Sequence, residues 1–318
     1  MACQFRRRPF GPYTLLTLGT DDDCVAFVPE ASGYVHQIRL GGRDLLRNYA
    51  DGEALRANFG HYNLALLPFP NRLRGGEYEW DGRPHRFPVN NEPTGSALHG
   101  YNHEARFGLT AVALGADAAT ARLSFLNHGA DYPRYGYPFP VLFELAMRVD
   151  FATPTFTWRL SARNVGTEPV PVGLGWHPYF ALPGGLGQWC LVMPANEQVE
   201  LDGALPTGRL LEGLPPKQPL PIDPAWDSCF RLDDPSADAT VELRGPQYSL
   251  SLKHAGDTRY TQLYVPEARD AVAVEPMTCG VDAFREARDE VTVAPGQTVA
   301  TSLEVVYRED EGTVAEVV

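Results

Sequence analysis

Paired cysteine motifs, long apolar runs and net positive charge are all absent from this chain of 318 residues. Its five cysteines are odd in number and scattered, and without a CxxC pair the sequence predicts neither a zinc knuckle nor a thioredoxin-like redox motif. No apolar segment approaches membrane-spanning length, and no signal-peptide-like stretch follows the basic residues near the N-terminus. These absences predict a cytoplasmic protein with reduced thiols and no membrane partner.

The charge balance excludes further classes of partner. With 40 acidic and 27 basic residues the formal net charge is -13, whereas nucleic acids and anionic membranes reward clustered positive charge. The glycine-rich phosphate loop, the dinucleotide fingerprint and the GxSxG elbow are also missing, so no nucleotide cofactor is expected. His99 and His103 have the spacing of two ligands on one helical face, but Gly100-Tyr101-Asn102 between them disfavours a helix. We therefore expect no metal.

Strand signals fill the chain from end to end, punctuated by 30 glycines and 28 prolines. Asp81-Gly82, Asp202-Gly203 and Pro295-Gly296 each lie between strand-like runs and predict hairpin turns, the last joining Val291–Ala294 to Val299–Tyr307. Helical spacing is confined to short turns within Asp44–Phe59, and the Pro-rich Leu214–Pro224 predicts a surface loop. The fold class expected is all-β, a large antiparallel sandwich with few short helices, formed by residues 1–318 as a single domain.

Two residues stand out because each directly precedes a proline after a strand-like run. His177 lies in Trp176-His177-Pro178, and Glu275 lies in Glu275-Pro276 after Ala271–Val274. A residue before proline is pushed toward extended geometry, so both side chains are expected to project from strand ends. An imidazole and a carboxylate form a possible proton donor and acceptor near neutral pH, although a core histidine and a surface acid remain alternatives.

Other polar residues offer weaker signals. Arg72 carries a rigid fork of donors suited to hydroxyls or a carboxylate, although a surface salt bridge is the commoner role. His99 suits a hydrogen-bonding loop or a structural role, and Asp227 suits either a hydroxyl acceptor or a turn residue. Gln262 lies mid-strand on the face opposite Leu263, so it either meets solvent or lines a cleft. The remaining histidines are interpreted as structural or exposed: His36, His61, His85, His128 and His254.

Taken in chain order, a set of short motifs resembles the aldose 1-epimerase (galactose mutarotase) family. They span residues 71 to about 284 and comprise Asn71-Arg72, Leu98-His99-Gly100, Trp176-His177-Pro178-Tyr179-Phe180, Trp226-Asp227, Gln262-Leu263-Tyr264 and Glu275-Pro276-Met277-Thr278. The family fold is a large β-supersandwich, in agreement with the strand pattern.

The resemblance implies roles for individual residues. His177 matches the general acid, Glu275 the general base and His99 the second active-site histidine. Asn71, Arg72, Tyr179, Asp227 and Gln262 match positions beside the sugar. The implied reaction is interconversion of the anomers of a free aldose, without a cofactor, by a monomer or homodimer. The alternatives are a hexose 6-phosphate mutarotase, for which Arg74 and Arg47 could bind the phosphate, and a non-catalytic sugar-binding or sensor protein.

Overall fold

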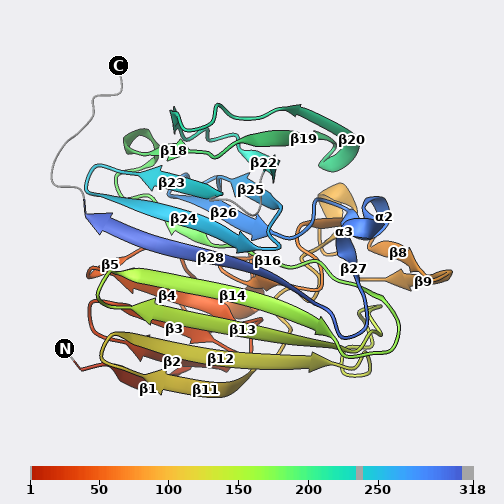
Figure 1. Ribbon diagram of the computed structural model, residues 1–318, viewed down its shortest axis with the longest axis horizontal. Helices are drawn as coiled ribbons and strands as arrows, with labels where there is room; N and C mark the ends of the chain where they lie inside the picture. The colour runs from red at the N-terminus through yellow and green to blue at the C-terminus, as the bar shows by residue number, and fades with distance from the viewer. Residues whose placement is uncertain (1, 234–238, 310–318) are drawn as a thin grey trace.

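The computed structural model describes residues 2–233 and 239–309, and strands dominate it (Figure 1). Within these ranges the only α-helices are α1 (Gly52–Ala57), α2 (Ala283–Glu286) and α3 (Arg288–Val291), of six, four and four residues. Asp51 is the N-cap of α1, because its side chain accepts a hydrogen bond from the Ala54 amide. The predicted all-β class with few short helices is confirmed.

One layer is a nine-stranded antiparallel sheet. Its long central strands alternate buried and exposed residues, as expected for a sheet with one face on the core. In sheet order the strands are β11 (Gly108–Leu114), β12 (Ala118–Asn127), β13 (Val141–Asp150), β14 (Thr155–Asn164), β28 (Thr298–Glu309), β24 (Tyr248–Gly256), β23 (Thr240–Arg244), β18 (Cys190–Val192) and β21 (Pro219–Pro221).

The second layer contains two sheets that pack against the first. An eight-stranded sheet contains β20 (Leu205–Glu212), β19 (Asn196–Asp202), β22 (Asp227–Leu232), β25 (Tyr260–Tyr264), β26 (Ala271–Met277), β16 (Gly175–Trp176) and β6 (Ala65–Leu66), with β17 (Tyr179–Ala181) also paired to β26. A five-stranded sheet contains β1 (Gln4–Phe10), β2 (Tyr13–Gly19), β3 (Cys24–Val28), β4 (Tyr34–Leu40) and β5 (Arg43–Asp44). A bridge between Leu46 and Phe180 links them, while β2 packs on β12 and β26 on β28.

Three short strand pairs complete the fold. They are β7 (Arg72–Arg74) with β10 (Ser96–Leu98), β8 (Glu77–Trp80) with β9 (Arg83–Arg86), and β15 (Val170–Pro171) with β27 (Thr292–Val293). The turns predicted at Asp81-Gly82 and Asp202-Gly203 join β8 to β9 and β19 to β20, as expected. The hairpin predicted at Pro295-Gly296 is wrong, because β27 pairs with β15 whereas β28 pairs with β14 and β24.

Two further expectations need correction. The Pro-rich 214–224 segment is not wholly a loop, since its β21 pairs with β18 at the end of the sheet, a place where proline is tolerated. The strand carrying Glu275 does not end at Val274 but continues to Met277. Pro276 has no amide hydrogen to donate, but the strand is held on both sides of it. The Val274 amide donates to the Pro178 carbonyl, and the Thr278 amide donates to the Leu174 carbonyl.

Candidate active site

The alternation of β26 places Glu275 on the outer face of the eight-stranded sheet. Val272 and Val274 point into the main core between the layers, so Ala273 and Glu275 point the opposite way. Glu275 lies directly across from Gln262 of β25, which in turn lies across from Cys229 of β22. Neighbouring strands thus bring the amide of Gln262 beside the carboxyl of Glu275.

The register of β16 and β17, which flank His177, brings that residue to the same position. Gly175 faces Met277 and Tyr179 faces Ala273, so His177, midway between them, falls opposite Glu275. The distance between His177 Nε2 and Glu275 Oε1 is 3.4 Å. The predicted donor and acceptor, almost a hundred residues apart in sequence, are therefore in direct contact.

Burial governs the charge of this pair. His177 and Glu275 are 5% and 2% exposed. Loss of hydration lowers the pKa of His177 well below its ordinary value, and the nearby charge of Arg72 lowers it further. Loss of hydration likewise raises the pKa of Glu275 well above its ordinary value, as does the charge of Asp227, while Arg72 opposes that rise. Both shifts favour the uncharged forms of the ligand-free pair, a neutral imidazole and a protonated carboxyl, which together hold one proton.

A second wall of the site comes from the residues around β7 and β10. The Asn71 amide donates to His99 Nδ1 over 3.1 Å, and the His99 amide donates to the Asn71 carbonyl over 2.9 Å. From Asn71 the contacts continue across the sheet, since Asn71 Nδ2 donates to Gln262 Oε1 and Gln262 Nε2 donates to Asp227 Oδ1. Arg72 closes the ring of contacts by donating to Asn71 Oδ1 and to Asp227 Oδ2.

These side chains surround a cavity of about 260 Å³, referred to below as the cleft. All eight residues singled out in the sequence line it: Asn71, Arg72, His99, His177, Tyr179, Asp227, Gln262 and Glu275. Its volume lies just below the range of about 300–1,000 Å³ typical of small-molecule pockets, which suits a single small ligand. Tyr179 stacks on the His177 ring with centroids 4.8 Å apart and thus fixes the orientation of that imidazole.

Five further residues line the cleft without having been given a role from the sequence: Gly60, His61, Asn91, Leu98 and Tyr264. Tyr264 follows Gln262 by two residues in β25, so strand alternation could have placed it on the same face. His61 had no such signal, because it lies in an irregular segment after α1. His103 does not line the cleft, and no group of three or more potential ligands in the described ranges could hold a metal ion.

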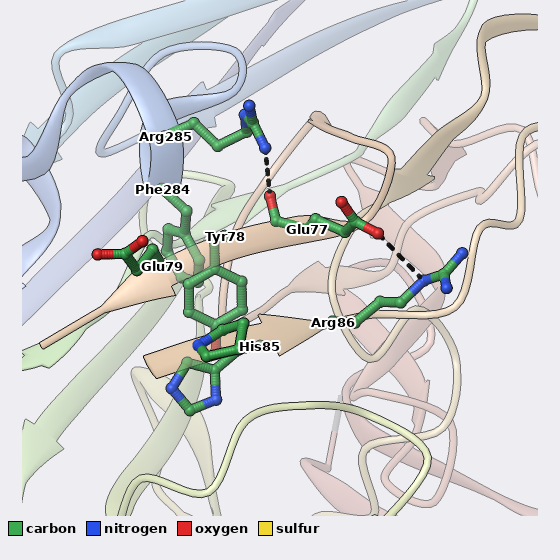
Figure 2. A pocket seen from close by; sticks show the side chains of 8 residues that line it. Glu77, Tyr78, Glu79, His85, Arg86, Phe284 and Arg285 are labelled. Carbon is green, nitrogen blue, oxygen red and sulfur yellow. Dashed lines mark hydrogen bonds and ion pairs between the residues drawn. The ribbon is translucent and has the colours of Figure 1, made fainter. Parts of the chain in front are cut away.

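A larger concavity elsewhere lacks comparable chemistry. It has a volume of about 640 Å³ and lies between α2 and the β8–β9 hairpin (Figure 2). Arg285 donates to the Glu77 carbonyl, the Glu77 carboxylate faces Arg86, and Tyr78 stacks on His85. Both arginines of this concavity are thus paired with Glu77, and the cleft, where an imidazole and a carboxyl meet, remains the candidate active site.

A family model described as aldose 1-epimerase matches residues 14–305. The chain belongs to the aldose 1-epimerase family. This membership confirms the resemblance seen in the sequence motifs. Two relatives from Escherichia coli K12 are described as uncharacterised proteins. YihR is 26% identical over 250 residues, covering 74% of this chain and 76% of YihR, and YphB is 25% identical over 259 residues, covering 75% and 81%.

Solved structures share the epimerase family fold at low identity. A galactose mutarotase-like protein from Clostridium acetobutylicum superposes with a TM-score of 0.85 at 14% identity, covering 97% of this chain and 99% of its own. Galactose 1-epimerase from Lactobacillus acidophilus gives a TM-score of 0.80 at 16% identity, with the same coverage. Among the described residues, no helix has the length and apolarity needed to cross a bilayer.

Proposed function

We propose that this family member is a cofactor-independent aldose 1-epimerase that interconverts the α and β anomers of a free aldose. The observation that carries the proposal is the contact between His177 Nε2 and Glu275 Oε1 at 3.4 Å in a cleft that suits a single small ligand. In a pyranose the C1 hydroxyl oxygen and the ring oxygen are bonded to the same carbon. An acid and a base that act on these two oxygens must therefore lie close together, as His177 and Glu275 do.

The proposed reaction consists of proton transfers and one bond rotation. Glu275 removes the proton from the C1 hydroxyl, the bond between C1 and the ring oxygen breaks, and the ring oxygen takes a proton from His177. The aldehyde then turns about the C1–C2 bond. In the reverse transfers the C5 hydroxyl adds to the other face of C1, His177 recovers its proton and Glu275 returns one to the new C1 hydroxyl.

The electrostatics of the pair are compatible with this cycle. The reaction starts from protonated His177 and ionised Glu275, whereas burial favours the neutral pair in the empty cleft. Both forms contain the same single proton, and its transfer across 3.4 Å needs no exchange with solvent. Arg72 lies in the same cleft, where its charge favours ionised Glu275 but disfavours protonated His177, so its effects on the two ends of the transfer oppose each other.

The hexose 6-phosphate alternative receives less support. Arg74 is paired with Asp282 and Glu286, Arg47 is paired with Asp270, and neither arginine lines the cleft. Arg72 is the one cation among the described cleft residues, and it already contacts Asp227. A phosphate dianion would therefore meet no unpaired positive charge there, and a neutral sugar fits better.

A non-catalytic sugar-binding protein would not need an acid and a base in contact. Retention of both groups in the fold of an epimerase family supports catalysis over binding alone. The distinction is experimental, because a binding protein would recognise an aldose without changing its rate of anomer interconversion.

The direct test is polarimetry on freshly dissolved α-D-glucose and α-D-galactose. We expect the chain to accelerate the approach to anomeric equilibrium, and His177→Asn and Glu275→Gln each to reduce kcat by about 10²–10⁴-fold, the usual effect of one positioned acid or base. Competition by glucose 6-phosphate would reveal the phosphorylated alternative. Unchanged rates with every aldose tried, or full activity in both variants, would exclude the proposed function.

A further inference from the structure

Besides His99 and His177, which belong to the sequence motifs, a third histidine, His61, contributes an imidazole to the cleft. His99 lies in the middle of a row, with its ring centroid 5.0 Å from that of His61 and 5.2 Å from that of His177. His61 lines the cleft, yet neither the sequence motifs nor the reaction proposed above gives it a role.

Local contacts fix the orientation of the His61 ring. Its Nδ1 lies 2.9 Å from Asn102 Oδ1, an oxygen that also accepts a hydrogen bond from Asn58 Nδ2 over 2.6 Å. The Asn58 amide is itself oriented by Tyr49, whose hydroxyl donates to Asn58 Oδ1 over 3.0 Å. Asn58 Nδ2 also lies 3.3 Å from His61 Nδ1, but its much shorter bond goes to Asn102 Oδ1. Because the Asn102 oxygen can only accept, the shorter contact at His61 Nδ1 places the proton of the neutral ring on that nitrogen. Its Nε2 is therefore an acceptor.

That acceptor is unpaired and accessible, in a residue that lines the cleft. His61 Nε2 has no hydrogen-bond partner among the described residues. It is also not one of the unpaired side-chain atoms that are fully buried. Burial of the ring lowers the pKa of His61, so the imidazole is neutral and Nε2 keeps its lone pair. A ligand in the cleft would find an oriented acceptor at this point.

The neighbouring histidine has the opposite polarity. Since the Asn71 amide donates to His99 Nδ1, the proton of the neutral His99 ring lies on Nε2, which becomes a donor. The two rings thus present one acceptor and one donor side by side. Adjacent hydroxyls of a sugar, each able to donate and accept, match this arrangement.

We propose that His61 is a further sugar-binding and specificity-determining residue, whose Nε2 accepts a hydrogen bond from the aldose hydroxyl next to the one that receives a bond from His99. This inference rests on the proposed function of the cleft. A site oriented to bond a hydroxyl rejects analogues that lack it, because the polar group of the protein is then left unpaired. His61 thereby selects aldoses that carry a hydroxyl at one particular carbon.

His61→Asn is the informative substitution. The backbone at His61 has φ of 56°, a left-handed conformation that asparagine adopts more readily than most residues. The asparagine amide can still donate to Asn102 from the position of Nδ1, but it is too short to replace Nε2. Phe59→Ala is the matched control, since Phe59 belongs to the same segment, is 83% exposed and does not line the cleft.

The test measures kcat/KM for an accepted aldose and for its 2-, 3-, 4- and 6-deoxy analogues. With the parent sugar we expect His61→Asn to lose about 3- to 10-fold, mainly through KM, as for one neutral hydrogen bond. Phe59→Ala should match the wild type. With one deoxy analogue, His61→Asn and wild type should become equal. An equal loss with the parent and with every analogue, or no loss with the parent, would overturn the role of His61.

Failure of the proposed function would look different. In that case wild-type protein would not accelerate anomer interconversion with any sugar, and binding of the same series would be measured by calorimetry instead. The same pattern in Kd, a loss with the parent that disappears with one analogue, would support His61 as a sugar-binding residue of a non-catalytic protein. Absence of binding to the wild type would remove both proposals.

Discussion

Burial controls the charge of the two groups proposed to transfer protons. Net charge on the pair is disfavoured whether it gains a second proton or loses the first, because both forms would be poorly hydrated. Because the pKa of His177 is lowered, the pair binds a second proton only at lower pH. Because the pKa of Glu275 is raised, the pair loses its single proton only at higher pH. The active one-proton form is therefore expected over a wider pH range than ordinary values of about 6.5 and about 4.3 would give.

Asp227 provides a test of this electrostatic argument. Its negative charge raises the pKa of Glu275, so Asp227→Asn should let the pair lose its proton at lower pH. We expect the alkaline limb of the pH profile of kcat/KM to move down by about one unit, the scale of a nearby charge. The position of the limb is informative even if sugar binding weakens. A limb that stays in place or moves up would contradict the assignment.

The sequence could predict the identities of eight cleft residues because each occurs within a recognisable motif, and the structure brings all eight together. Their catalytic and binding roles remain predictions. It could not predict His61, whose position depends on contacts with Asn58 and Asn102 that are remote in sequence or lie in irregular backbone. Its tautomer, which decides whether Nε2 donates or accepts, is likewise a product of tertiary structure.

At the scale of elements, β7 is the strand that positions Arg72, and Asp282 holds it in place. Asp282 is 1% exposed and follows β26 in the chain. Its Oδ1 accepts from the Arg74 amide over 2.9 Å, while its own amide donates to the Arg72 carbonyl over 2.9 Å. One residue thus ties β7 to the chain segment that carries Glu275.

Asp282→Ala should therefore loosen β7. It leaves the Arg74 amide without its acceptor and places alanine at φ of 58°, so we expect a loss of about 1–3 kcal/mol in the free energy of unfolding, together with a higher KM. Asp282→Asn tolerates that backbone and keeps an oxygen for Arg74, so it should lose much less. Denaturant unfolding measures both, and equal destabilisation by the two variants would refute the role of this hydrogen bond.

Strand existence was easier to predict than strand pairing. The period-two pattern of β12, β13 and β14 depends only on neighbouring residues, and the structure reproduces it. The error at Pro295-Gly296 has the opposite origin. The turn forms, with the Gln297 amide bonded to the Ala294 carbonyl, but the strands on either side find better partners in distant parts of the chain.

At the scale of the whole molecule, buried and half-buried histidines that stay neutral make the fold sensitive to acid. Burial lowers the pKa of His254 to about 4, and burial together with the charge of Arg8 lowers that of His36 to about 4. His254 is 3% exposed, and its Nδ1 lies 3.1 Å and 3.2 Å from the carbonyls of Ala239 and Leu252. The unfolded chain would protonate these rings near the ordinary value of about 6.5, well before the folded protein does.

Stability should therefore fall as pH decreases from about 6.5 to about 4. In this window the unfolded state binds more protons, and each such histidine removes about 1.4 kcal/mol per pH unit from the free energy of unfolding. The net charge of -13 at pH 7 acts in the opposite direction, because acidification relieves repulsion between surface carboxylates. At an ionic strength of 0.15 M that repulsion is screened beyond about 8 Å, so the buried histidines should dominate.

His254→Asn isolates one of these contributions. The asparagine amide can still donate to a carbonyl, and although the variant should be less stable at pH 7, its decline between pH 6.5 and 4 should be shallower by about 1.4 kcal/mol per pH unit. His128→Asn, at an exposed position, serves as the control and should leave the decline unchanged. Denaturant unfolding at several pH values measures these slopes. A slope for His254→Asn equal to that of the wild type would show that His254 does not contribute to the acid sensitivity of the fold.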